Sequence, residues 1–298
     1  QFALRLPDAS PGEGQLELLA GLQNAKLASA YRYVPWHSAG EHTLAWLQKS
    51  LTSGDIEQAS FVHIGPLKGG PNGGRLDMRF KLKNAVLDYV PGWPVLSGLD
   101  ATVDISGQRL SILGERGQIL SAQAKNLIAE IPNLRRPVLS VKSDLALDLA
   151  DIDKLLAESP LKKQTAAVAE RLALSGPAQA RLTLSVPLSS GATAVNVDAQ
   201  LNNAVIGLAQ ENLRFEQVRG AIQFDSQRGL DASALQASLW QKPVTIQLRG
   251  EQRKGHWWQQ QVQIQAPIEL AALGRWSGVD VLRYARGGSV ADVLVKMP

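Results

Sequence analysis

The sequence contains no cysteine, so disulfide bonds and thiolate metal sites are both excluded. Aromatic residues make up only 5% of the chain. No stretch approaches the roughly 18 to 20 apolar residues of a membrane-spanning helix. The excess of base is small, with a formal net charge of +4. A charge that is so small and so scattered is compatible with anionic lipid and argues against nucleic acid as a partner.

From the strand-like ends of the chain we expect neither a signal peptide nor an anchor helix within it. Residues 1–5 already alternate like a strand, and residues 289–298 resemble a strand that has just begun. We therefore expect an interior segment of a longer protein. Its 298 residues suffice for one large β domain or two ordinary ones.

Catalytic motifs are also missing. The four histidines (His37, His42, His63 and His256) share no metal-site spacing, and neither an HExxH nor a GxSxG motif occurs. The glycine-rich stretch 65–75 lacks the Gly-Lys-Ser/Thr ending of a phosphate-binding loop, which indicates a flexible connection. We expect the chain not to be an enzyme and to need no metal or cofactor.

Two further polar stretches have simple structural explanations. Asp148, Asp151 and Asp153 fit helix capping and compensation of the helix dipole better than a cation site. Residues 253–261 combine base with tryptophan, as nucleic-acid sites do, but Lys254 and Gly255 are more typical of a hairpin turn. Neither stretch therefore predicts a ligand.

Alternation of apolar and polar residues is what the sequence has in abundance. In residues 76–83 every second residue is apolar and every other one is charged, which predicts a strand with one apolar and one solvated face. Short turns separate the repeats of this pattern and predict antiparallel hairpins. The candidate residues of the apolar face are Leu76, Met78, Phe80, Leu82, Val103, Ile105, Leu145, Leu147, Leu182, Leu184, Val186, Val195, Val197, Ile222, Phe224, Val244, Ile246, Leu248, Val262 and Ile264.

Helical spacing is confined to three segments. The first runs from a capping-box pattern at Ser38 to Gly54, where a C-terminal cap is expected. The second covers residues 159–176, after a short turn at 151–157, and a third follows Pro267. So little helix cannot cover a long one-sided sheet.

The apolar face must therefore be covered by the sheet itself or by a ligand. The sheet could close into a barrel, pack as a sandwich, or fold along its length into a trough. The apolar residues of the predicted strands are mostly Val, Leu, Ile and Ala. They therefore fit a thin lining of a groove at least as well as an interdigitating core. We predict a mostly β fold: an elongated, twisted antiparallel sheet curled into a hydrophobic groove, with two or three short helices.

A weak internal repeat favours one continuous groove segment over residues 1–298. Residues 99–120 and 218–240 share their pattern, with Val103 matching Ile222 and Leu110 matching Leu230. Repeats that cannot bury their apolar faces alone are typical of stacked arrays.

Four blocks of the sequence resemble a known family. The most specific features are Tyr89, Pro91, Trp93 and Pro94, and the Trp-Leu pair at 46–47 that precedes Gly-Asp. The blocks are residues 30–67, 87–112, 151–161 and 213–230. On these residues the chain resembles the YhdP-type branch of the AsmA-like proteins.

The resemblance implies a bridge-like lipid carrier of the Gram-negative envelope. Such proteins are anchored in the inner membrane by an N-terminal helix and span the periplasm as a β groove that carries phospholipid towards the outer membrane. This chain would be an interior, periplasmic section without the anchor. Its partners would be phospholipid acyl chains and, for the full-length protein, the two membranes. The family implies no catalytic residues.

Two other function classes stay open. The same array could be a β-scaffold or chaperone for envelope assembly, with exposed strand edges that recruit other β proteins. It could also be a β-sandwich binding module, which would show two packed sheets. A carrier should have a hollow, open lumen, whereas a scaffold should have a dry, filled interior.

Overall fold

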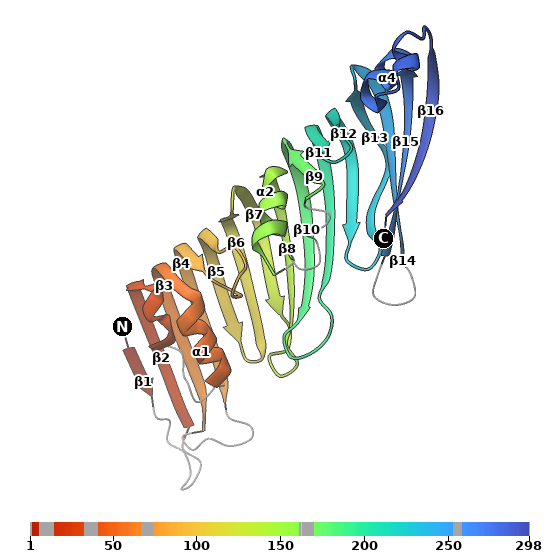
Figure 1. Cartoon of the computed structure of the whole chain (residues 1–298). Helices are drawn as coiled ribbons and strands as arrows, with labels where there is room; N and C mark the ends of the chain where they lie inside the picture. The colour runs from red at the N-terminus through yellow and green to blue at the C-terminus, as the bar shows by residue number, and fades with distance from the viewer. Residues whose placement is uncertain are drawn as a thin grey trace. The chain divides into compact units, whose positions relative to one another are not determined.

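The computed structural model describes residues 2–5, 15–32, 41–66, 74–160, 162, 170–252 and 258–297. Within these residues the chain forms one antiparallel sheet of 16 strands with a few short helices (Figure 1). The predicted class, a mostly β chain with an antiparallel sheet, is confirmed. None of the described helices is long and apolar enough to cross a membrane.

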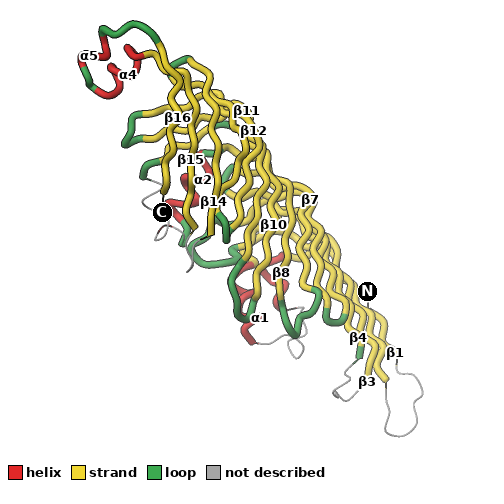
Figure 2. The backbone as a smooth tube through the Cα atoms, turned by 90° about the vertical axis from the view of Figure 1, so that its right-hand side faces the viewer, coloured by secondary structure: helices red, strands yellow, loops and turns green. Residues whose placement is uncertain are grey.

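The strands follow one another across the sheet in chain order, except that β9 lies off this path and pairs with β11. Successive strands lie side by side, and their connections alternate between the two strand ends (Figure 2). The strands are β1 (Phe2–Arg5), β2 (Gln15–Lys26), β3 (Leu51–Pro66), β4 (Arg75–Leu87), β5 (Leu96–Ser106), β6 (Arg109–Ile119), β7 (Ala122–Ile131), β8 (Val138–Asp148), β9 (Leu172–Ser175), β10 (Pro177–Pro187), β11 (Ala194–Leu208), β12 (Leu213–Asp225), β13 (Gly229–Leu239), β14 (Lys242–Gln252), β15 (Trp258–Glu269) and β16 (Gly288–Met297).

The helices all lie in connections at one end of the strands. They are the 3-10 helix η1 (Leu27–Arg32) and the α-helices α1 (Glu41–Ser50), α2 (Ala150–Glu158), α4 (Leu270–Ser277) and α5 (Asp280–Arg283). The described residues thus contain four short α-helices, where the sequence suggested two or three.

The first predicted helix ends earlier than its pattern suggested. Leu51 already belongs to β3 and pairs with Leu87. Gly54 is therefore a strand residue, with φ +119, and not a helix cap. Pairing with β4 satisfies the backbone hydrogen bonds of this segment, so the sheet overrides the helical spacing.

The segment expected to be a short turn before the second predicted helix is itself the helix α2, with Ser159 as its C-terminal cap. Lys162 is helical, and its N–H donates to the carbonyl of Ser159. Leu172 lies in β9, paired with Leu208. The other expected positions, residues 161 and 163–169, lie outside the described residues. The third predicted helix starts later, at Leu270, because β15 stays paired with β16 as far as Glu269.

The chain divides into two compact units. Unit 1 comprises residues 1–143 and 184–193, and unit 2 comprises residues 144–183 and 194–298. Each unit has its own cluster of buried apolar residues. The two stretches with a common pattern, 99–120 and 218–240, form the hairpins β5–β6 and β12–β13, one in each unit.

Left-handed residues interrupt the long strands of both units. Among them are Asn24, Gly54, Asn84, Gly98, Asn126, Asn203, Gln217 and Gly220. The pairing registers shift beside several of them, for example between Leu82 and Ala85 and between Leu201 and Ala204. Such bulges bend a strand and increase its twist. Asparagine and glycine tolerate the left-handed conformation better than other residues, which explains their presence here.

Candidate functional site

The register of β4 and β5 brings the predicted apolar residues of unit 1 onto one face of the sheet. Met78 pairs with Ile105, and Phe80 pairs with Val103. Directly opposite residues of an antiparallel pair project from the same face. The remaining predicted residues here, Leu76 and Leu82, lie on the same face because they alternate with the charged residues of β4.

Unit 2 repeats this arrangement. The predicted residues that pair with one another are Val197 with Phe224, Ile246 with Ile264, and Leu248 with Val262. Ile222 and Val244 pair with alanines of the neighbouring strands, Ala199 and Ala237. Val195 lies two residues before Val197 in β11 and therefore projects from the same face.

The strands β8 and β10 carry the other predicted residues. They are Leu145, Leu147, Leu182, Leu184 and Val186. All five are partly buried, and Leu147 packs against the apolar core of unit 2.

The apolar face of unit 1 has several further members that were not predicted from the sequence. Phe61 pairs with Met78, and Ile112 pairs with Val103. The strands β3 and β6 also place apolar residues on the opposite face, such as Val62 and Leu113, so their alternation is incomplete. Pairing with the clearly alternating β4 and β5 was the signal that could have identified them.

One part of the apolar face is closed in each unit. In unit 1, Leu27 and Ala30 of η1 are buried together with Ile56 and Ala85 beside the bulges. In unit 2 the buried cluster includes Val218, which is fully buried. These residues form ordinary dry cores.

The other part of the apolar face is open. Phe80, Val103 and Ile105 in unit 1, and Ile222 and Phe224 in unit 2, are only partly buried. All described strands belong to one sheet, so within the described residues of each unit no second sheet covers these side chains. The side chains of the open part therefore keep some contact with solvent within each unit.

The polar face of unit 1 carries ion pairs between neighbouring strands. Arg79 Nε lies 2.6 Å from Asp104 Oδ1, and Lys81 Nζ lies 3.0 Å from Glu57 Oε2. The contact with Glu57 raises the pKa of Lys81. A concavity of about 700 Å³ lies over these residues, with Thr102 in its lining. Since its lining includes charged groups that an apolar ligand would desolvate, it offers little to such a ligand.

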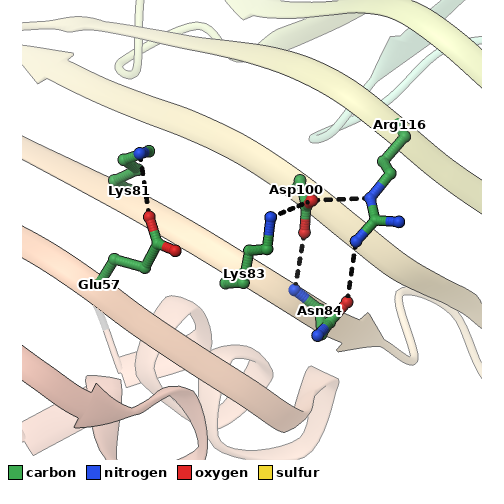
Figure 3. A network of polar contacts seen from close by, with 6 residues as sticks. All are labelled: Glu57, Lys81, Lys83, Asn84, Asp100 and Arg116. Atoms are coloured by element: carbon green, nitrogen blue, oxygen red, sulfur yellow. Dashed lines mark hydrogen bonds and ion pairs between the residues drawn. The ribbon is translucent and has the colours of Figure 1, made fainter.

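Asp100 is the centre of a polar network at a bulge of unit 1 (Figure 3). Its side chain is only 7% exposed. Its carboxylate accepts hydrogen bonds from the backbone N–H of Asn84 at 2.9 Å, from Lys83 Nζ at 2.8 Å and from Arg116 Nε at 2.7 Å. Burial alone would raise the pKa of Asp100, but these three contacts outweigh it, and the pKa lies below its usual value. Asp100 thus fastens β4 and β6 to β5 where β4 bends.

We expect Asp100→Asn to lower the free energy of unfolding by about 2 kcal/mol, because a buried, charge-assisted network loses its charge. Urea unfolding at pH 7 measures this. The folded-state pKa is depressed, so the contribution is present above the unfolded-state value and is lost as the pH falls. The difference in the free energy of unfolding between wild type and variant should therefore become smaller below about pH 4.

Asp104→Asn is the matched control for this measurement. Asp104 also pairs with an arginine, but its side chain is 30% exposed. We expect a loss below about 1 kcal/mol, as is usual for exposed pairs. Equal losses of unfolding free energy in the two variants would show that Asp100 does not stabilise the bend of β4.

The described residues contain no group of three or more His, Asp or Glu side chains that could hold a metal ion. Asp148 accepts a hydrogen bond from the N–H of Ala150 at the start of α2, and Asp153 accepts one from the N–H of Leu174. Asp148 thus has the capping role that the sequence predicted, whereas Asp153, in the first turn of α2, also holds the backbone of β9. His37 and His256 lie outside the described residues.

Comparisons with known proteins agree with the resemblance found in the sequence. The family model described as "YhdP protein" matches residues 1–298. The chain is 25% identical over 237 residues to the intermembrane phospholipid transporter YhdP of Escherichia coli strain K12. The alignment covers 78% of this chain and 19% of that relative, so the chain spans about a fifth of its length. No solved structure matches the chain.

Proposed function

Because the chain belongs to the YhdP protein family, we propose that it is one section of a hydrophobic conduit that carries phospholipid between the inner and outer membranes. In this proposal residues 1–298 are one continuous groove segment of a longer periplasmic protein. The observation that carries it is the open apolar face of each unit, which no second sheet covers within the described residues.

The physical task of such a conduit is to keep acyl chains out of water. Exposing a chain costs about 0.8 kcal/mol for each methylene, so a 16-carbon chain costs roughly 12 kcal/mol. Partly exposed side chains such as Phe80 and Ile222 can remove much of this penalty. The arrangement needs no catalytic group, because the lipid slides along the apolar wall while its headgroup stays in water.

The experiment that tests the proposal is lipid extraction from the purified protein. After purification in mild detergent, mass spectrometry of organic extracts should find phospholipid bound to the wild type. The variant Phe224→Asp, which puts a charge on the open part, should retain clearly less.

Gln223→Asp is the matched control, because its neighbouring position in β12 projects from the polar face. It should retain as much lipid as the wild type. Protein that is free of lipid after mild purification, and that does not take up phospholipid from vesicles, would contradict the carrier and favour a scaffold in envelope assembly.

A further inference from the structure

The two ends of the strands differ in charge. The helices occupy the connections at one end, which we call the helical end, and short hairpin connections occupy the other, which we call the hairpin end. From β3 to β15 the connections at the hairpin end are residues 67–74, 107–108, 132–137, 188–193, 226–228 and 253–257. The connection between β1 and β2, residues 6–14, lies outside the described residues and carries two acids, Asp8 and Glu13.

The six connections of the hairpin end from β3 onwards contain no acidic residue. Their cations are Lys68, Arg135, Arg136, Arg228, Arg253 and Lys254. Lys68, Arg253 and Lys254 lie outside the described residues and contribute only to this composition. The helical end is balanced by contrast, since its connections carry acids such as Asp151, Glu158 and Glu211 beside their bases.

In unit 1 the described hairpin connections hold their arginines in defined positions. The N–H of Leu134 donates to the carbonyl of Gln108, which joins the β7–β8 connection to the β5–β6 turn. Asn133 accepts a hydrogen bond from the N–H of Arg135 and closes a tight turn. Arg135 and Arg136 are exposed, and neither has an acidic partner among the described residues. Both guanidinium groups at this end are therefore without an acidic partner in the described part of the chain.

Exposed aliphatic side chains accompany these two arginines. Leu134 lies between Asn133 and Arg135 and is 37% exposed. Leu188 is 51% exposed, and its N–H donates to the carbonyl of Pro137 at the end of the same connection. Guanidinium groups beside aliphatic surface match the phosphate and upper acyl region of a phospholipid.

The dimensions of the open apolar face agree with this match. From Leu82 of the closed core to Leu76, near the hairpin end, β4 spans ~20 Å at about 3.3 Å per residue, and Met78 between them is also buried. The acyl region of one leaflet is about 15 Å deep, half of a bilayer core. An acyl chain on the open face therefore ends before the closed core when its headgroup is at the hairpin end.

We propose that the hairpin end of unit 1 binds the phosphate of phospholipids through Arg135 and Arg136, with the acyl chains directed along the strands towards the bulges. The proposal rests on the proposed function and adds an orientation of the lipid to it. The recognised group is the anionic phosphodiester that phospholipids share.

Lipid loading tests the orientation. The full-length protein is incubated with vesicles that contain phosphatidylglycerol and diacylglycerol, then reisolated, and both lipids are quantified. In the double variant Arg135→Glu/Arg136→Glu, bound phosphatidylglycerol should fall about threefold to tenfold, as expected from replacing two exposed attractive contacts by repulsive ones. Bound diacylglycerol, which has acyl chains and no phosphate, should stay unchanged. Soluble glycerophosphoglycerol should not compete, because it lacks the acyl chains.

Arg275→Glu/Arg286→Glu is the matched control at the helical end. Both arginines are exposed, and the change in net charge is the same. This variant should load both lipids normally. Equal loss of both lipids, equal loss in the control, or unchanged phosphatidylglycerol in the test variant would each overturn the proposed orientation while the carrier function stands. A wild type that loads neither lipid would overturn the proposed function itself.

Discussion

In the proposed conduit, Ile105→Asp should reduce phospholipid transport by the full-length protein about tenfold or more while the protein stays folded. Ile105 lies on the open part of the apolar face and is only partly buried, so the strand can accommodate the new side chain. A carboxylate there keeps water around it, and an acyl chain that passes must displace that water. The penalty for an unpaired polar group in apolar surroundings is about 1 to 3 kcal/mol or more, and about 1.4 kcal/mol already corresponds to a tenfold loss of rate.

The same change in unit 2, Ile222→Asp, separates a conduit from a local pocket. If lipids pass along both units, each substitution alone should stop transport. Thr102→Asp and Gln223→Asp are the matched controls, since they lie on the polar faces of the same two strands and should transport normally. Transport is measured as transfer of fluorescent phospholipid between vesicles or as outer-membrane integrity, with circular dichroism to check folding. Normal transport in the Ile105→Asp/Ile222→Asp double variant is the result that would end the conduit hypothesis.

Strand faces could be predicted from the sequence because strand periodicity is local. Leu76 to Leu82 alternate without a break, and the register with β5 places Met78 opposite Ile105 and Phe80 opposite Val103. A register shift of one residue would move all of these apolar side chains to the solvent-exposed face, so the pattern also specifies the register. The loading and transport experiments test the contact of these residues with lipid.

Helix boundaries and the closed cores could not be predicted in the same way. Helical spacing continues through Leu51, but pairing with Leu87 makes that residue part of a strand. The role of Leu27 was equally hidden, because η1 is buried by contacts with Ile56 and Ala85, which lie far along the chain. Non-local contacts of this kind leave no periodic signal in the sequence.

The sequence contains a weak signal from which the bulges could have been predicted. Asparagine and glycine are poor strand formers, yet Asn84 and Asn203 lie within long alternating segments, each followed by alanine. In the structure both have positive φ, and the register shifts next to each. An isolated asparagine or glycine inside a clear strand pattern thus indicates a bend.

Gly54→Ala should lower the free energy of unfolding by about 3 to 5 kcal/mol. Gly54 has φ +119, a backbone conformation that costs a side-chain-bearing residue about 1 to 3 kcal/mol. A Cβ atom there would also lie 2.7 Å from the Cα of Ala85 and 2.9 Å from the carbonyl oxygen of Asn84. Both are backbone atoms, so β3 and β4 would have to separate. Thermal and urea unfolding of wild type and variant measure the loss.

The variant Gly98→Asn distinguishes the cost of the close backbone contact from the cost of the left-handed conformation. Gly98 has φ +58, which asparagine tolerates, and nothing lies within 4 Å of a Cβ built there. We expect a loss below about 1 kcal/mol. Gly176→Ala should resemble Gly54→Ala in unit 2, because its Cβ would lie 3.0 Å from the Cα of Ala204. If Gly54→Ala and Gly98→Asn cost the same, backbone conformation alone would explain the glycine, and the close contact between β3 and β4 would not be what holds the bend in unit 1.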